Sequence, residues 1–273
     1  MTAAHPLDAL STVADATAYF VRWRRWSDDV RAHTLHARDL QYGAGGDETL
    51  DLLVPHTGAP LVVFFHGGYW RRLHKDDFTF VAGALAPHGV ATAIVNYSLA
   101  PAVTLETIVD QAQRSVAWLR ANASEHGFDP SRIVVAGHSA GGQLAAMCAV
   151  DAPVFGLVTL SGLHDLRPLV DSFANEWLGL DQARAVALSP MFAAPAEPVT
   201  IYASAGEFES EGFKEQGRDF AAAWEARGCD AVYADSEGDN HFTIVDRLRD
   251  EKDPLVQRIV QLALARRRKP ARV

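Results

Sequence analysis

Cysteine and long apolar runs are scarce in this 273-residue chain. Its two cysteines cannot build a disulfide scaffold, and one of them, Cys148, lies in an apolar stretch typical of a buried helix. No run of about 18 apolar residues is present to form a transmembrane helix. The N-terminal segment lacks the basic and apolar regions of a secretory signal. We therefore expect a reduced, cytoplasmic protein without membrane association.

Positive charge is also in short supply. The chain has 25 Lys and Arg against 34 Asp and Glu, which gives a formal net charge of −9. Nucleic-acid binding needs a clustered basic face, so we expect no such partner. The one dense basic run, residues 266–269, is typical of a solvated tail. The expected partner is a small-molecule substrate, and a homodimer is compatible with the sequence, which does not fix the oligomeric state.

Apolar runs alternate with helix-like segments along most of the chain. A composition that is 48% hydrophobic suffices for one core, so we predict a single domain over residues 1–273. The alternation predicts an α/β fold with a mostly parallel twisted sheet and helices on both faces. The expected strands are 50–54, which alternates like a half-buried strand, and 61–65, 90–95, 133–136, 155–160, 199–203 and 231–234. The expected helices are 105–126, 140–150, 211–227 and 254–266.

Two segments interrupt this alternation. Residues 1–36 place Trp23 and Trp26 in a polar, helical context, which favours an N-terminal covering arm rather than core. Residues 164–198 are predicted to form a cap-like insertion above the sheet edge. No internal repeat or low-complexity segment is present.

Gly137-His138-Ser139-Ala140-Gly141 matches the pattern G-x-S-x-G. An expected strand precedes it and an expected helix follows it, as a nucleophile elbow requires. Small residues around the serine let the helix approach the strand closely, and the serine takes a strained backbone conformation. This context favours Ser139 as a nucleophile in an α/β-hydrolase fold, over an ordinary turn in which Ser139 caps a helix.

A second glycine-rich turn, His66-Gly67-Gly68-Tyr69-Trp70, follows the expected strand 61–65. Glycines let backbone N–H groups point at a substrate oxygen, so the candidate oxyanion-hole donors are the amides of Gly67 or Gly68, together with that of Ala140. Without the serine elbow, the alternative to an oxyanion hole is an ordinary glycine-rich turn beside a tryptophan of the core.

Chain order selects the other catalytic candidates, because the triad of this fold runs serine, acid, histidine. Only His164 and His241 follow Ser139. His164 comes too early to leave room for an acid, so His241 is the candidate base. We prefer Glu209 as the acid because it lies deep in its loop and is followed by Ser210, a candidate helix N-cap. Glu207, Asp165 and Asp239 stay alternatives, in that order. No histidine has a partner at a convincing metal-ligand spacing, so neither metal nor cofactor is expected.

The HGGYW segment, the GHSAGG elbow, GEFESEGFKEQ and DNHF, in this order, resemble the kynurenine formamidase group of α/β hydrolases, near the hormone-sensitive-lipase-like esterases. The resemblance covers roughly residues 38–262. HGGxW is the most diagnostic motif, since the related esterases usually carry a third glycine where this chain has Tyr69. The family's acid is usually an aspartate, and the aligned residue here is Glu209, which is one methylene longer.

The resemblance implies hydrolysis of N-formyl-L-kynurenine to L-kynurenine and formate, a step of tryptophan breakdown. Plausible stacking residues for its aromatic leaving group are Tyr69, Trp70, Phe173 and Trp177, with core or lid packing as the alternative. A carboxylesterase of short acyl esters would use the same triad. A third hypothesis is a non-catalytic binding module, although such proteins usually lose a triad member.

Overall fold

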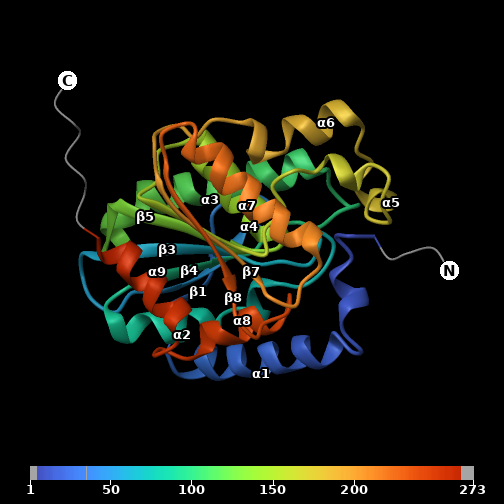
Figure 1. The fold of residues 1–273 in the computed structure, drawn as a ribbon. Helices are drawn as coiled ribbons and strands as arrows, with labels where there is room; N and C mark the ends of the chain where they lie inside the picture. The colour runs from blue at the N-terminus through green and yellow to red at the C-terminus, as the bar shows by residue number, and fades with distance from the viewer. Residues whose placement is uncertain (1–4, 35, 266–273) are drawn as a thin grey trace.

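The computed structural model describes residues 5–34 and 36–265, which form helices on both faces of an eight-stranded sheet (Figure 1). The strand order is β1-β2-β4-β3-β5-β6-β7-β8. Pairing is parallel from β4 to β8 and antiparallel where β2 meets β1 and β4. The strands are β1 Ala37–Gln41, β2 Thr49–Leu53, β3 Ala59–Phe65, β4 Ala91–Val95, β5 Phe128–His138, β6 Gly156–Leu160, β7 Thr200–Gly206 and β8 Asp230–Ser236. The predicted mostly parallel sheet is confirmed.

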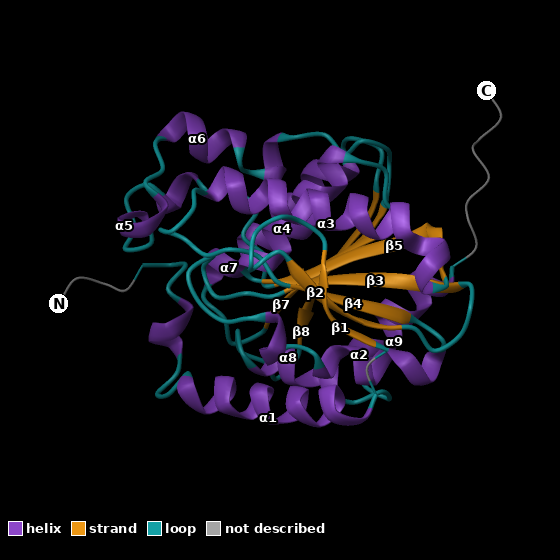
Figure 2. Ribbon diagram, turned by 180° about the vertical axis from the view of Figure 1, so that it is seen from behind, coloured by secondary structure: helices purple, strands orange, loops and turns teal. Residues whose placement is uncertain are grey.

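Helices cover both faces, as predicted (Figure 2). The first face carries α3 (Leu105–His126), α4 (Ala140–Asp151) and α7 (Glu211–Glu225), and the second carries α2 (Phe80–Leu85) and α9 (Pro254–Leu264). Strands β3, β4 and β6 are buried along their whole length because both of their faces are covered. Within the described residues, no helix is both long and apolar enough to cross a membrane.

Strand β2 differs from its prediction, which was a half-buried strand. Four of its five residues are buried, and these include Asp51 at 0% exposure. The Asp51 carboxylate lies 2.7 Å from Nζ of the equally buried Lys75 and 2.9 Å from the guanidinium of Arg31. The alternating pattern predicted that Asp51 faces solvent. Its carboxylate instead contacts this ionic cluster. It ties β2 to α1 and to the loop that follows β3.

Neither β1 nor α2 was predicted from the sequence, and the start of β5 was predicted too late. Strand β1 is short, and its residues are half-buried or exposed without an alternating apolar pattern. Helix α2 has six residues, which is too short for a periodic signal. Helix α2 forms because its neighbours bury it, and β1 forms by pairing with β2, rather than through intrinsic propensity.

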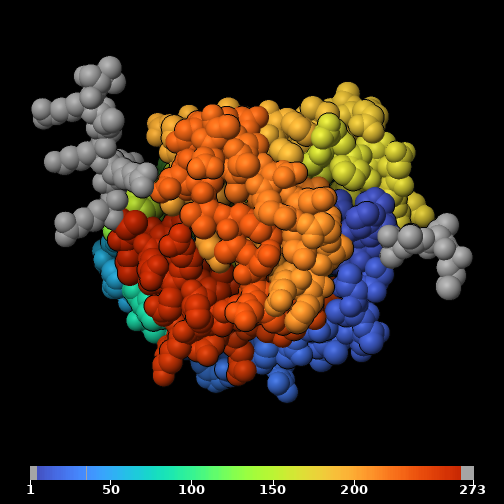
Figure 3. Space-filling model, viewed as in Figure 1, coloured from blue at the N-terminus to red at the C-terminus, as the bar shows by residue number. Residues whose placement is uncertain are grey.

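The N-terminal segment belongs partly to the core, contrary to the expected covering arm. Helix α1 (Thr17–His33) packs on α2, and Trp23 on α1 is 1% exposed within the main hydrophobic cluster. The insertion 164–198 contains the short helices α5 (Asn175–Leu178) and α6 (Gln182–Ala187). Figure 3 shows the blue N-terminal segment packed beside the yellow insertion and the orange region around α7. The basic run 266–269 lies outside the described residues.

Candidate active site

Ser139 sits on the sharp turn between β5 and α4, in a backbone conformation that is rare for a residue with a side chain. Its φ is 55° and its ψ is −120°. The Ser139 side chain makes no capping hydrogen bond to α4, so it is not an ordinary helix N-cap. Strain of this kind persists where the surrounding structure enforces it, and a nucleophile elbow is such a place.

Glycines on both sides of Ser139 make this turn possible. A Cβ atom added to Gly137 would lie 2.1 Å from the carbonyl oxygen of Gly141, and one added to Gly141 would lie 2.0 Å from that of Phe65. Both distances are far inside van der Waals contact. Helix α4 can therefore approach β5 and β3 this closely only because these positions lack side chains.

His241 and Glu209 form a buried pair. His241 lies in the loop between β8 and α8 (Thr243–Asp246), and its Nδ1 is 2.7 Å from Oε2 of Glu209. The other carboxylate oxygen accepts hydrogen bonds from the Ser161 hydroxyl at 2.5 Å and from the Gly206 amide at 2.6 Å. The two side chains are 4% and 1% exposed. The carboxylate is therefore held in one orientation and is available to fix the tautomer of the imidazole.

The other three acidic candidates do not contact the His241 side chain. Each is hydrogen-bonded elsewhere: Glu207 to the Gly238 amide, Asp165 to the side chain of Arg167, and Asp239 to the side chains of Ser236 and Arg247. Ser210 was also predicted from the sequence to be the N-cap of α7. Ser210 does occupy the N-cap position, but its hydroxyl donates instead to the carbonyl of Pro6.

His138 and His66 hold backbone around the site. Nε2 of His138 donates to the carbonyl of His241 at 2.9 Å, and Nδ1 of His66 donates to the carbonyl of Gly67 at 2.8 Å. Burial lowers the pKa of His66 to about 4. Burial, with the neighbouring His241, holds the pKa of His138 well below its ordinary value. Both rings are therefore neutral near pH 7 and act as hydrogen-bond donors to carbonyls.

The glycine-rich turn after β3 lies against Ser139. A Cβ atom at Gly67 would be 3.2 Å from Cβ of Ser139. In the described part of the chain, neither Gly67 nor Gly68 donates its amide to a protein acceptor. The amide of Ala140 is also unused within its helix, because it is the first residue of α4. These unpaired amides are therefore the candidate donors to negative charge on an oxygen bound at Ser139.

Three residues that follow these glycines also have positive φ, which marks a strained loop. The φ values are 54° for Tyr69, 54° for Trp70 and 70° for Leu73. The side chains of the neighbouring Tyr69 and Trp70 lie in different environments. Tyr69 lines the pocket at Ser139, whereas Trp70 is completely buried and donates its indole N–H to Gln143.

Of the four aromatics predicted either to stack on substrate or to pack in the core or lid, only Tyr69 lines this pocket. The Trp177 indole donates to the carbonyl of Tyr69 at 3.0 Å, and Phe173 packs its ring edge-on against Tyr69. Trp177 and Phe173 thus pack against Tyr69. An indole N–H needs an acceptor when it is buried, and the acceptors here are the Gln143 side chain and the Tyr69 carbonyl.

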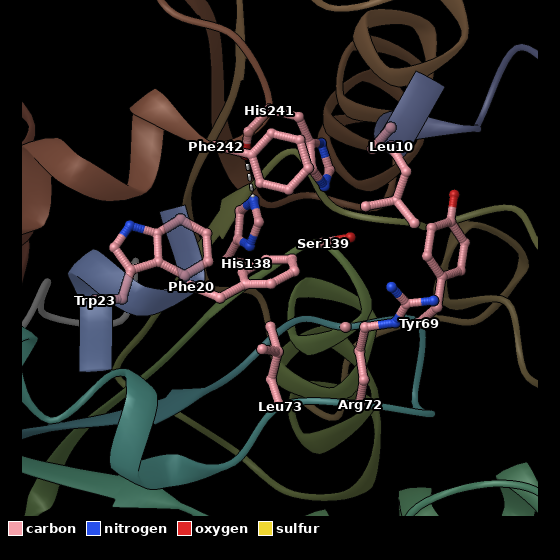
Figure 4. Close-up of a pocket in the computed structure, with 12 residues that line it drawn as sticks. Leu10, Phe20, Trp23, Tyr69, Arg72, Leu73, His138, Ser139, His241 and Phe242 are labelled. Carbon is pink, nitrogen blue, oxygen red and sulfur yellow. Dashed lines mark hydrogen bonds between the residues drawn. The ribbon is translucent and has the colours of Figure 1, made fainter. Parts of the chain in front are cut away.

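The pocket itself is small and mostly apolar (Figure 4). Its volume is about 30 Å³, which is room for about two water molecules. Ser139 and His241 both line it. The other lining residues are Ala9, Leu10, Phe20, Trp23, Gly68, Tyr69, Arg72, Leu73, His138 and Phe242.

Four of these residues come from the N-terminal segment, and the sequence analysis missed all of them. Phe20 and Trp23 are three residues apart and so share one face of α1, a spacing that could have suggested a buried face. Ala9 and Leu10 carry no comparable signal. The segment is held in place by the Tyr69 hydroxyl, which donates to the carbonyl of Leu7, and by His5, which contacts the carbonyl of Pro168.

His164 lies apart from the pocket. It is completely buried, its ring stacks on Phe220 with centroids 4.0 Å apart, and burial lowers its pKa to about 3. Among the described residues, no three His, Cys, Asp or Glu side chains gather where they could hold a metal ion.

Comparison with known proteins identifies relatives over most of the chain. The BD-FAE family model matches residues 50–157. The kynurenine formamidase of Salmo salar is 31% identical over 241 residues, which are 82% of this chain and 81% of the relative. That of Danio rerio is 29% identical over 252 residues, 86% of this chain and 85% of the relative. Esterase LipQ of Mycobacterium tuberculosis is 26% identical over 77% of this chain and 58% of the relative.

Solved structures give the same architecture. A Silicibacter protein that is provisionally assigned as a thioesterase superimposes with a TM-score of 0.85 at 30% identity, covering 97% of this chain and all of its own. A Pyrobaculum calidifontis esterase superimposes with a TM-score of 0.69 at 21% identity, covering 92% and 94% of the two chains. The predicted α/β-hydrolase fold is confirmed.

Proposed function

The chain belongs to the kynurenine formamidase family of α/β hydrolases, and from that premise we propose that it hydrolyses N-formyl-L-kynurenine to L-kynurenine and formate. The observation that carries the proposal is the buried His241–Glu209 pair, whose histidine lines one small pocket together with the strained Ser139. This arrangement supplies a nucleophile, a base and an acid in the chain order of the fold. The coarser statement, a hydrolase of the α/β-hydrolase family, holds whatever the acyl group.

In the first half of the reaction, Ser139 attacks the formyl carbon while His241 takes the hydroxyl proton. Glu209 stabilises the imidazolium that forms and keeps its Nδ1–H directed at the carboxylate. The oxyanion is bound by the amides of Gly67 or Gly68 and of Ala140, each typically contributing about 3 kcal/mol to the barrier reduction. His241 then gives its proton to the departing aryl amine, and the formyl group stays on Ser139.

In the second half, a water molecule attacks the formyl-enzyme. His241 acts again as the base, the same amides bind the oxyanion, and formate leaves with regeneration of the Ser139 hydroxyl. Water and the formyl group are both small. A pocket of about 30 Å³ at Ser139 therefore supports a small acyl group, with the larger aryl amine toward the mouth.

A short-acyl carboxylesterase is the second candidate, and similarity to esterase LipQ favours it. The two functions share the site and differ in substrate. The measurement that separates them is kcat/KM for N-formylkynurenine against kcat/KM for 4-nitrophenyl acetate. We expect the formamide to be at least as good a substrate, and an ester preference of a hundredfold or more would contradict the formamidase proposal.

Catalysis itself is tested by Ser139→Ala. We expect it to abolish turnover of both substrates and labelling by a fluorophosphonate probe, with an unchanged unfolding transition. A wild-type protein that is inert toward every acyl substrate and toward the probe would instead favour the non-catalytic binding module.

A further inference from the structure

Arg72 stands out in the pocket because of its charge. Among the described residues that line the pocket, it is the only Lys, Arg, Asp or Glu. Most of the other lining side chains are aliphatic or aromatic, and His138 is neutral near pH 7. Arg72 is exposed, which places its guanidinium at the mouth rather than at the bottom of the pocket.

The Arg72 side chain has no protein partner within residues 5–34 and 36–265. It forms neither an ion pair nor a hydrogen bond there, whereas its neighbour Arg71 lies over the Trp177 ring at 4.4 Å from the centroid. Other arginines of the molecule are paired, for example Arg24 with Asp28 and Arg184 with Glu106. Five donors in a planar fork are therefore free at the entrance to the site.

The position of Arg72 is fixed relative to the candidate oxyanion hole. Its amide donates to the carbonyl of Gly68 at 3.1 Å, and a Cβ atom at Gly68 would lie 3.0 Å from Cγ of Arg72. The aliphatic stem of the arginine thus packs on the glycine whose amide is a candidate donor. Arg72, Tyr69 and Ser139 line the same pocket (Figure 4).

We propose that Arg72 binds a carboxylate on the leaving group of the substrate and so makes the enzyme selective for aryl amides whose leaving group carries a carboxylate. The acyl group occupies the small space at Ser139, so a charged group at the mouth belongs to the leaving part. A guanidinium pairs with a carboxylate through two parallel hydrogen bonds. On a protein of net charge −9, one free arginine at the entrance also attracts an anion locally.

For N-formyl-L-kynurenine, this inference rests on the proposed function, since that substrate carries a carboxylate on the side chain beside the formamide. The charge preference itself does not depend on that function. It applies equally to esters whose leaving group carries a carboxylate. The two ideas can therefore fail separately.

The test compares two substrate pairs whose members differ by one carboxylate. The first pair is N-formylkynurenine and its decarboxylated analogue N-formylkynuramine, and the second is 4-carboxyphenyl acetate and phenyl acetate. Arg72→Gln removes the charge but keeps most of the stem on Gly68, and Arg71→Gln is the matched control. A third variant, Arg72→Lys, keeps the charge without the fork.

We expect Arg72→Gln to lower kcat/KM about tenfold or more for the carboxylate member of each pair, mainly through KM, and less than threefold for the member that lacks the carboxylate. Arg72→Lys should lose less, Arg71→Gln should alter the ratio within a pair by less than twofold, and the wild-type preference should weaken with added salt. Equal losses on both members of the ester pair would overturn the inference. An Arg72-dependent preference within the ester pair, with no activity on N-formylkynurenine, would sustain it while refuting the proposed function.

Discussion

We propose Glu209 as the triad acid, in a place that an aspartate usually holds in this family. Its extra methylene carries the carboxylate to His241, and the Ser161 hydroxyl and Gly206 amide hold the second oxygen. Those two donors leave the carboxylate no freedom to turn away. The position of the Glu209 carboxylate is therefore defined by its hydrogen bonds rather than by the length of the side chain.

We expect Glu209→Gln to lower kcat by about 10⁴-fold, as the corresponding change does in other triads. The amide can present its NH₂ group to Nδ1 and so favour the wrong tautomer of His241. The control is Glu207→Gln, which changes an exposed side chain bonded to the Gly238 amide and should alter kcat only a fewfold. The reverse order of effects in steady-state kinetics would assign the acid to Glu207.

At the scale of single residues, the sequence predicted the catalytic candidates more accurately than the residues that line the pocket. Ser139 and His241 follow from a motif and from chain order, and the structure places both in one pocket. Trp70 and Trp177 could not be assigned, because an aromatic side chain near a motif can face the substrate or the core. Only the location of an acceptor for each indole N–H decides between the two.

At the scale of elements, long helices and buried parallel strands were predictable because their apolar patterns are continuous. Helix α3 begins and ends where its pattern does, and Gly127 follows it in a left-handed conformation. The burial of β2 was predicted wrongly because Asp51 has the charge of a solvent-facing residue. In the structure it pairs with the buried Lys75. The N-terminal contribution to the pocket was missed because it depends on contacts with residues far away in sequence.

The N-terminal residues that line the pocket should limit the size of the acyl group. Leu10 lines the pocket, and Leu10→Ala would remove three carbon atoms from that wall. We expect the ratio of kcat/KM for 4-nitrophenyl butyrate over 4-nitrophenyl acetate to rise about tenfold. Val21→Ala, on the exposed face of α1, is the control and should leave the ratio unchanged. An unchanged ratio in Leu10→Ala would show that the acyl group does not meet this segment.

At the scale of the whole molecule, buried neutral histidines should make stability depend on pH. The pKa values of His66 and His164 are about 4 and about 3 in the folded chain, against an ordinary 6.5. Between these values and 6.5 the unfolded chain binds protons that the folded chain does not. Stability is therefore complete above about pH 6.5 and is lost as the pH falls toward 4, with each histidine contributing up to about 1.4 kcal/mol per pH unit.

We expect His164→Gln to flatten this dependence. The free energy of unfolding, measured in urea between pH 7 and pH 4.5, should fall less steeply in the variant by about 1 kcal/mol per pH unit. Comparing slopes separates the effect from a uniform loss of stability. His33→Gln, at a side chain that is 74% exposed, should keep the wild-type slope. A slope in His164→Gln equal to that of the wild type would show that His164 titrates normally in the folded chain.

The placement of the first and last described residues has a practical consequence for anyone who produces this protein. The segment that begins at His5 runs along the pocket wall through Leu10, whereas α9 ends at Leu264 on the other side of the molecule (Figure 1). An amino-terminal affinity tag would join the chain through the segment that lines the pocket. A carboxyl-terminal tag joins it through α9 instead, so kinetic work should use the carboxyl-terminal fusion.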